Sequence, residues 1–352
     1  MTAPIISFFV IGVILPLKYD KENRGIKSVA TVTLAPMEGV VDVYMRDMLT
    51  RIGGFDLCVS EFVRVSQHLY PASVFHHLCP ELKQGGQTAA GVPVHVQIMG
   101  GEAQVMAENA AFAAELGAPG IDLNFGCPAK TVNRHDAGAT LLQWPERLHE
   151  IVSAVRRAVP GNVPVSAKMR LGFSDKALAL DNALAVAAAG AGKLTVHART
   201  KMEGYRPPAH WDCLRPIRER LDIPVVANGE IWTAADYAIC REISGCDDVM
   251  VGRGVIARPG LGREIAAARK GQPSTPALDW PDILSLITEY RALIRGMDNP
   301  PREAGRLKQW IKLLGRTYGD AGDLFLKIRR HDTPDDILRD VERARADLPA
   351  AA

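Results

Sequence analysis

The sequence lacks several features that would assign it at once to a class of protein. Its 352 residues carry 42 Lys and Arg against 40 Asp and Glu, and this near balance indicates no overall electrostatic attraction to nucleic acid. Its six cysteines include no C-x-x-C pair, which argues against a zinc knuckle or a thioredoxin-like motif. So few cysteines in a chain of this length favour a reducing compartment. We therefore expect a cytoplasmic protein with no metal site.

The longest apolar segment is too short to span a bilayer. Residues 5–17 read IISFFVIGVILPL, whereas a spanning helix needs about 20 apolar residues. Basic residues do not precede this run and small residues do not follow it, as a secretory signal would require. We therefore expect residues 1–30 to be an N-terminal extension outside the main fold, arising from a start codon assigned too early. A membrane anchor is the alternative.

Short apolar runs alternate with helical patterns from residue 31 onward. The runs are rich in β-branched residues, and the stretches between them, such as 103–118 and 145–159, place apolar residues at helical spacing. Eight such units in about 230 residues match a (β/α)8 TIM barrel, which we predict over residues 31–272. A doubly wound open sheet fits less well, because no G-x-G-x-x-G follows the first run. The predicted strand runs are 31–37, 55–62, 92–100, 120–128, 163–172, 194–200, 223–231 and 247–254.

The C-terminal part of the chain has a different pattern. Residues 273–281 (PSTPALDWP) are typical of a linker, and residues 279–346 contain three to four helical segments with no strand-like run. We predict a small helical bundle domain over residues 273–352. Residues 291–330 hold ten basic and four acidic side chains. This local excess is either a solvated helix face or a surface that contacts the phosphate backbone of a nucleic acid.

Polar residues cluster at the ends of the predicted strands, where TIM barrels place their active sites. After the last two strands, ANGEI and MVGRG supply glycines and Arg253, which suit a phosphate group. Lys168 and His197 suit an electron-accepting ring, because a cation near a flavin stabilises the negative charge of its reduced form. Gln97 can donate and accept at once, as a ring imide requires. Each of these residues alone is also compatible with an ordinary hydrogen-bonded group at a barrel mouth.

Cys127 lies in the segment DLNFGCPAKTVNRHDAGATLL (122–142), on a loop that follows a predicted strand. A free thiol is mostly protonated at neutral pH, so Cys127 could act as a general acid as well as a nucleophile. A buried structural cysteine is the alternative, although Cys58 and Cys246 fit that role better. No Cys-His-Asn set is recognisable in the sequence.

Eight motifs together resemble those of the tRNA-dihydrouridine synthase family. These enzymes are flavin-dependent (β/α)8 barrels with a C-terminal helical domain that binds tRNA. The resemblance runs from about Leu34 to about Arg330, and LNFGCP followed by K-T-V and G-A-T-L-L is its most specific part. Within the family, EFVRV, GATLL and RLKQW look most like the C-type bacterial enzymes, which modify uridine 16. The motifs are LAPMEGV, VSEFVRV, VQIMG, LNFGCPAKTV, AKMRLG, VHARTKMEGY, VANGEI and VGRG.

The resemblance implies roles for individual residues. NADPH (or NADH) would reduce FMN, hydride would pass to C6 of uracil, and Cys127 would donate a proton to C5. The target base must leave its stack to enter a barrel mouth. By position, FMN would be held by Pro36, Met37, Glu38, Gln97, Lys168, His197, Asn228, Gly229, Glu230, Gly252 and Arg253. The residues that fall where the C-type enzymes contact tRNA are Arg64, Asn124, Tyr205, Arg306, Lys308 and Arg329.

Two other functions are compatible with these patterns. A flavin barrel that acts on a free small molecule, such as dihydroorotate or an enoate, would leave the basic helical region without a role. A non-enzymatic tRNA-binding protein should have lost part of the flavin site, and no position of that site looks lost. We expect a monomer that associates with no membrane and with no protein partner other than its tRNA substrate.

Overall fold

The protein is described by a computed structural model that covers residues 31–129, 137–273, 275–297 and 299–348. Within these residues the strands form one parallel sheet that closes into a barrel. Strand β1 (Val32–Leu34) pairs with both β2 (Leu57–Val59) and β9 (Asp248–Val251), and β2 also pairs with β4 (Val94–Met99), which closes the ring. The remaining barrel strands are β5 (Ile121–Phe125), β6 (Val165–Arg170), β7 (Lys193–His197) and β8 (Val225–Asn228). The predicted TIM barrel is confirmed, and the open sheet is excluded.

One additional strand, β3 (Val63–Arg64), was not predicted. It pairs with the last part of β4, where Val63 lies opposite Ile98 and Arg64 opposite Met99. Two residues are too few to produce a periodic pattern, so nothing in the sequence could distinguish this strand from a loop. It places Arg64 beside the C-terminal end of β4, at the rim where the strand ends meet.

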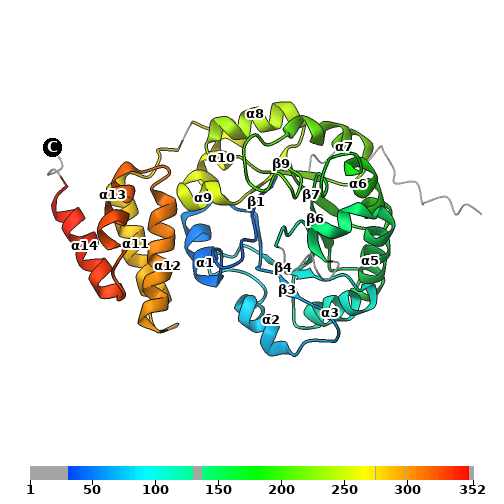
Figure 1. Cartoon of the computed structure of the whole chain (residues 1–352), viewed down its shortest axis with the longest axis horizontal. Coiled ribbons are helices and arrows are strands. Elements are labelled where there is room, and N and C mark those ends of the chain that lie inside the picture. The colour runs from blue at the N-terminus through cyan, green and yellow to red at the C-terminus, as the bar shows by residue number, and fades with distance from the viewer. Residues whose placement is uncertain (1–30, 130–136, 274, 298, 349–352) are drawn as a thin grey trace, which may run out of the picture. The chain divides into compact units, whose positions relative to one another are not determined.

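The helices form a ring around the outside of the barrel (Figure 1). The barrel strands are therefore covered on both faces, and every residue of β5 is buried. Short 3-10 helices are η2 (Pro80–Gln84), η3 (Gly138–Gln143) and η4 (Trp211–Cys213). The helices of the ring are α1 (Val43–Ile52), α2 (Ala72–Leu78), α3 (Ala103–Glu115), α5 (Pro145–Ala158), α6 (Ala179–Ala188), α7 (Leu214–Arg220), α8 (Ala234–Ser244), α9 (Arg253–Ala257) and α10 (Leu261–Arg269).

The helices after residue 273 pack against α1 and α9 of the barrel (Figure 1). Trp310 is buried at this contact, and its Nε1 donates to the backbone oxygen of Ile256 at 3.1 Å. Asp279 caps the first of these helices and Trp280 begins it, which agrees with the helical region predicted from residue 279 and ends the linker before residue 281. The helices are α11 (Trp280–Ile294), α12 (Pro300–Leu314), α13 (Gly319–Ile328) and α14 (Pro334–Ala346). The division into two domains near residue 272 stays a prediction.

The extension expected at residues 1–30 lies outside the described residues. Among the residues that the structure covers, no helix is long and apolar enough to cross a membrane.

Candidate active site

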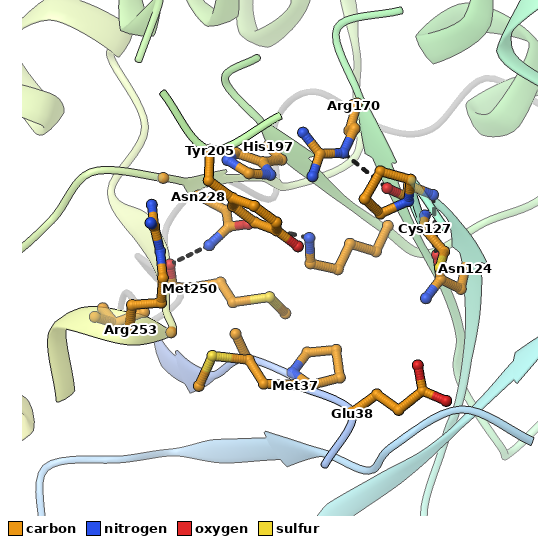
Figure 2. Close-up of a pocket in the computed structure, with 18 of the residues that line it drawn as sticks. Met37, Glu38, Asn124, Cys127, Arg170, His197, Tyr205, Asn228, Met250 and Arg253 are labelled. Atoms are coloured by element: carbon orange, nitrogen blue, oxygen red, sulfur yellow. Dashed lines mark hydrogen bonds between the residues drawn. The ribbon is translucent and has the colours of Figure 1, made fainter. Parts of the chain in front are cut away.

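A cavity of about 470 Å³ opens at the C-terminal ends of the barrel strands. Its volume lies in the range of about 300–1,000 Å³ that is common for small-molecule sites. All of the residues predicted to hold the cofactor line it, from Pro36 on the loop after β1 to Arg253 at the start of α9. Cys127, Asn124 and Tyr205 line the same cavity, and Figure 2 shows them around one space.

The loop that carries Cys127 is fixed by hydrogen bonds from both sides. Asn124 Oδ1 accepts from the backbone N–H groups of Gly126 and Cys127, at 2.9 and 3.0 Å. On the other side, Arg170 Nε donates to the backbone oxygen of Gly126 at 2.7 Å. The Cys127 thiol is free, and partial burial raises its pKa. The thiol is therefore protonated at neutral pH and can donate a proton into the cavity, whereas Cys58 is fully buried in the core.

Lys168 projects from β6 into the cavity, where its ammonium group has a fixed partner. Nζ donates to Asn228 Oδ1 at 3.0 Å, and Asn228 Nδ2 in turn donates to the backbone oxygen of Met250 at 2.8 Å. Burial lowers the pKa of Lys168 to about 8. Lys168 therefore carries its charge at neutral pH and loses it under mildly alkaline conditions.

His197 lies beside several cations and is neutral. Burial, and then the positive charges of Arg170 and Lys168, hold the pKa of its imidazole well below the ordinary value. Its Nε2 lies 3.4 Å from Arg199 Nη1. His197 thus offers a neutral polar ring to the cavity, and the positive charge in this region comes from Lys168, Arg170, Arg199 and Arg253.

The turn after β8 brings the backbone close to His197. Gly229 has φ +117°, and a Cβ there would lie 2.9 Å from His197 Cδ2, so a side chain has no room. Glu230 also has a positive φ, of 59°, which is uncommon for a residue other than glycine. Its carboxylate is held by an ion pair with Arg199 and accepts from Trp232 Nε1 at 2.9 Å. These contacts stabilise a backbone conformation that leaves the cavity wall open to a ligand.

A stack of alternating cations and aromatic rings extends from the cavity mouth, and sequence reasoning did not assign it. The Arg253 guanidinium lies 4.9 Å from the ring centre of Tyr205 and 5.1 Å from that of Trp232. The guanidinium of Arg316, which follows α12, lies 3.5 Å from the ring centre of Trp232. These residues come from separate segments of the chain, so no sequence spacing could have revealed their contact.

The residues predicted to contact tRNA occupy different surroundings. Asn124 is buried in the cavity wall, whereas Tyr205 is half exposed at its mouth. Arg306 pairs with Asp42 and lies 3.4 Å from the Tyr290 hydroxyl, so α12 is tied to the start of α1. Lys308 Nζ donates to the backbone oxygen of His331 at 2.7 Å, and Arg64 and Arg329 are exposed.

Among the described residues, no three acidic, histidine or cysteine side chains are placed together to hold a metal ion.

Comparison with known proteins agrees with the resemblance seen in the motifs. The family model described as dihydrouridine synthase matches residues 33–311. A curated protein of Pseudomonas putida named tRNA-dihydrouridine(16) synthase is 54% identical over 86% of this chain and 93% of its own length. Proteins of the same name from Ralstonia nicotianae and Neisseria meningitidis are 50% and 45% identical, over 89% and 91% of this chain and 95% and 96% of their own lengths. The chain therefore belongs to the dihydrouridine synthase family.

Proposed function

We propose that this protein reduces the C5–C6 double bond of uridine 16 in the D-loop of tRNA, with FMN as its flavin and NADPH as the electron donor. The observation that carries the proposal is the free thiol of Cys127, which lines the same cavity as Lys168 and the glycine turns after β8 and β9. An acid and a cation-rich cofactor wall in one cavity are what hydride and proton addition to a double bond require.

The residues present fit a flavin nucleotide. Gly229 and Gly252 line the cavity without side chains, so a phosphate can approach their backbone closely. A Cβ on Gly252 would also crowd Met37, because it would lie 3.3 Å from Met37 Sδ. Arg253 adds a guanidinium for that phosphate, and Met37 and Met250 supply apolar surface for a flat ring. FMN, when bound, supplies the hydride. Lys168 would stabilise negative charge on the ring, and Gln97 would bond its imide edge.

The role proposed for Cys127 is to protonate C5 of the uracil. Its raised pKa keeps the proton on sulfur at neutral pH, and the bonds from Asn124 and Arg170 fix the position of its loop. The uridine must leave its stack to reach this thiol. Asn124 in the wall and Tyr205 at the mouth are the residues that we expect to contact the extruded base.

We assign tRNA binding mainly to the helices after residue 272. Their basic stretch over residues 291–330 has no use in flavin chemistry, whereas a folded RNA needs a surface that neutralises its phosphates. We expect the protein to act as a monomer in the cytoplasm, where a reducing environment keeps Cys127 a thiol.

The proposal is tested by measuring which substrate reoxidises the reduced flavin. The purified protein should be yellow, and NADPH should bleach it. Unmodified tRNA should restore the yellow colour, and dihydroorotate or an enoate should not. Reoxidation by one of these small molecules but not by tRNA would favour the small-molecule oxidoreductase, and a colourless protein that binds tRNA would favour a binding protein.

The titration of Lys168 predicts a pH dependence of cofactor binding. Its folded-state pKa of about 8 lies below the ordinary lysine value, so the ammonium charge is present below pH 8 and is lost as the pH rises through it. Since FMN is an anion, its affinity should fall by about tenfold over this range. Lys168→Met should bind FMN weakly with a flat profile, measured by fluorescence quenching. Lys270→Met, at an exposed site after α10, is the control, and an unchanged slope in Lys168→Met would contradict the assignment.

Each exposed cation on the helices after residue 273 is expected to contact one phosphate of the tRNA. Arg329→Ala is expected to reduce the salt slope of tRNA binding by about 1, while the flavin spectrum and NADPH oxidation stay unchanged. Arg306 is less suitable for this test because it pairs with Asp42. Arg241→Ala, on the exposed face of α8, serves as the control and should leave the slope unchanged. A loss of flavin in Arg329→Ala would contradict the separation of the two roles.

A further inference from the structure

A buried carboxyl group lies beneath the cavity and has no role in the proposed reaction. Asp122 is on β5, and its side chain is 2% exposed. Its Oδ2 accepts from Gln97 Nε2 at 2.7 Å, and its Oδ1 accepts from Ser166 Oγ at 2.7 Å. A carboxyl group removed from water is costly unless neighbouring groups hydrogen-bond to it, and here two of them do.

Asp122 is the first member of a chain of hydrogen bonds that ends at the Cys127 loop. Gln97, which is fully buried on β4, uses Oε1 to accept from Asn124 Nδ2 at 2.8 Å. Asn124 Oδ1 accepts from the backbone N–H groups of Gly126 and Cys127. The amides of Gln97 and Asn124 therefore link the centre of the barrel to the proposed proton donor, and Figure 2 shows Asn124 next to Cys127.

The groups at the two ends of the chain allow only one orientation of each amide. Backbone N–H groups can only donate, so Asn124 must turn its oxygen toward the Cys127 loop and its nitrogen toward Gln97. At the other end, Asp122 Oδ2 accepts a hydrogen bond whether the carboxyl is ionised or holds a proton on its other oxygen. Gln97 must therefore turn its nitrogen toward Asp122 and its oxygen toward Asn124. The hydrogen bonds with Asp122 and with Asn124 therefore require the same orientation of the Gln97 amide.

We propose that Asp122 is a positioning residue that holds the amides of Gln97 and Asn124 in one orientation and thereby fixes the Cys127 loop. Its significance for catalysis rests on the proposed function. Asn124 has a second N–H, which suits a carbonyl oxygen of a uracil ring, and Gln97 is the residue expected at the imide edge of the flavin. Without Asp122, the Gln97 N–H would be buried with no acceptor, so the side chain would move and release Asn124.

The direct test replaces the acceptor, the Asp122 carboxyl group, with an apolar side chain of similar size. Asp122→Leu should slow tRNA reduction by about 10²-fold, as expected when a reacting group is displaced by about 1 Å. A readout independent of activity is the pH profile of Cys127 alkylation, followed by mass spectrometry of the peptide. Release of the loop would expose the thiol to water and move its titration toward the ordinary range. Alkylation at neutral pH should then rise by up to about tenfold for each pKa unit.

Two further variants separate hydrogen bonding from charge and from general destabilisation. Asp122→Asn keeps an oxygen for Gln97 and can donate to Ser166, so it should keep the wild-type alkylation profile. Ser166→Ala removes the other hydrogen bond of Asp122 and leaves the Gln97 contact, so it should do the same. An Asn variant that alkylates like Asp122→Leu, or a Leu variant that alkylates like the wild type, would overturn the proposal.

A reciprocal exchange keeps the proposal testable if Asp122→Leu does not fold. Gln97→Glu alone sets two carboxyl groups against each other, and adding Asp122→Asn restores one donor and one acceptor at this contact. The double variant should recover the alkylation profile that Gln97→Glu loses, and failure to recover it would overturn the proposal. Because alkylation needs no tRNA, this result stands apart from the proposed function, which is tested by whether the wild-type protein reduces tRNA.

Discussion

Cys127→Ala should reduce the rate of tRNA reduction by about 10²–10⁴-fold, the usual effect of losing a positioned general acid. The variant should bind FMN and accept electrons from NADPH like the wild type, because the thiol serves only the second half of the reaction. Reduced flavin should therefore persist when tRNA is added. Stopped-flow absorbance of the flavin, first with NADPH and then with tRNA, measures the two half-reactions separately.

A second cysteine provides the control for this variant. Cys213 is also partly buried and free, but it lies in η4 and does not line the cavity. Cys213→Ala should keep both half-reactions. If tRNA reoxidises the reduced flavin of Cys127→Ala at the wild-type rate, another group supplies the proton. Loss of flavin from this variant would assign Cys127 a structural role instead.

Glu81→Ala should lower the free energy of unfolding by about 3–5 kcal/mol, because it leaves a buried guanidinium without its counter-ion. Arg46 on α1 is fully buried, and Nε and Nη2 donate to the two carboxylate oxygens of Glu81 at 2.7 and 2.9 Å. The same guanidinium donates to the backbone oxygens of Val41 and Leu78, at 3.0 and 3.1 Å. Urea denaturation followed by circular dichroism measures the loss.

An exposed ion pair is the matched control for Glu81. Arg241 Nε lies 2.8 Å from Asp247 Oδ1, but both side chains are more than half exposed. Asp247→Ala should therefore cost no more than about 1 kcal/mol. Equal losses in the two variants would contradict the importance of burial at Glu81. Since Arg46 also holds Val41, which follows the proposed cofactor loop, Glu81→Ala should in addition weaken FMN binding.

The sequence was sufficient to predict the barrel and most of its rim, for a physical reason. Strands buried on both faces are continuous apolar runs, and each predicted run overlaps a barrel strand. Since parallel strands all end at one rim, polar residues that follow the runs are brought together whatever the lengths of the helices between them. This is why Gln97 on β4 and Arg253 after β9 line one cavity although they are far apart in sequence.

The features that sequence reasoning missed depend on contacts between separate elements. Asp122 looks like an ordinary residue of a strand until Gln97 and Ser166 are seen to donate to it. The contact between Arg316 and Trp232 joins the turn after α12 to a barrel loop, so it follows only from how the helices pack. The neutrality of His197 results from burial among cations, and its sequence neighbours reveal only some of them.

The most direct test of the proposed function is to map dihydrouridine in tRNA treated with the purified protein. The substrate is unmodified tRNA with uridines at positions 16, 17, 20 and 20a, incubated with NADPH and FMN, and the product is mapped by reverse-transcription stops after alkaline cleavage of dihydrouridine. The account predicts dihydrouridine at position 16, formed by the wild-type protein and not by Cys127→Ala. Modification at 17, 20 or 20a with 16 unchanged would contradict the assigned position, and tRNA left unmodified by a protein that oxidises NADPH would contradict the proposed activity.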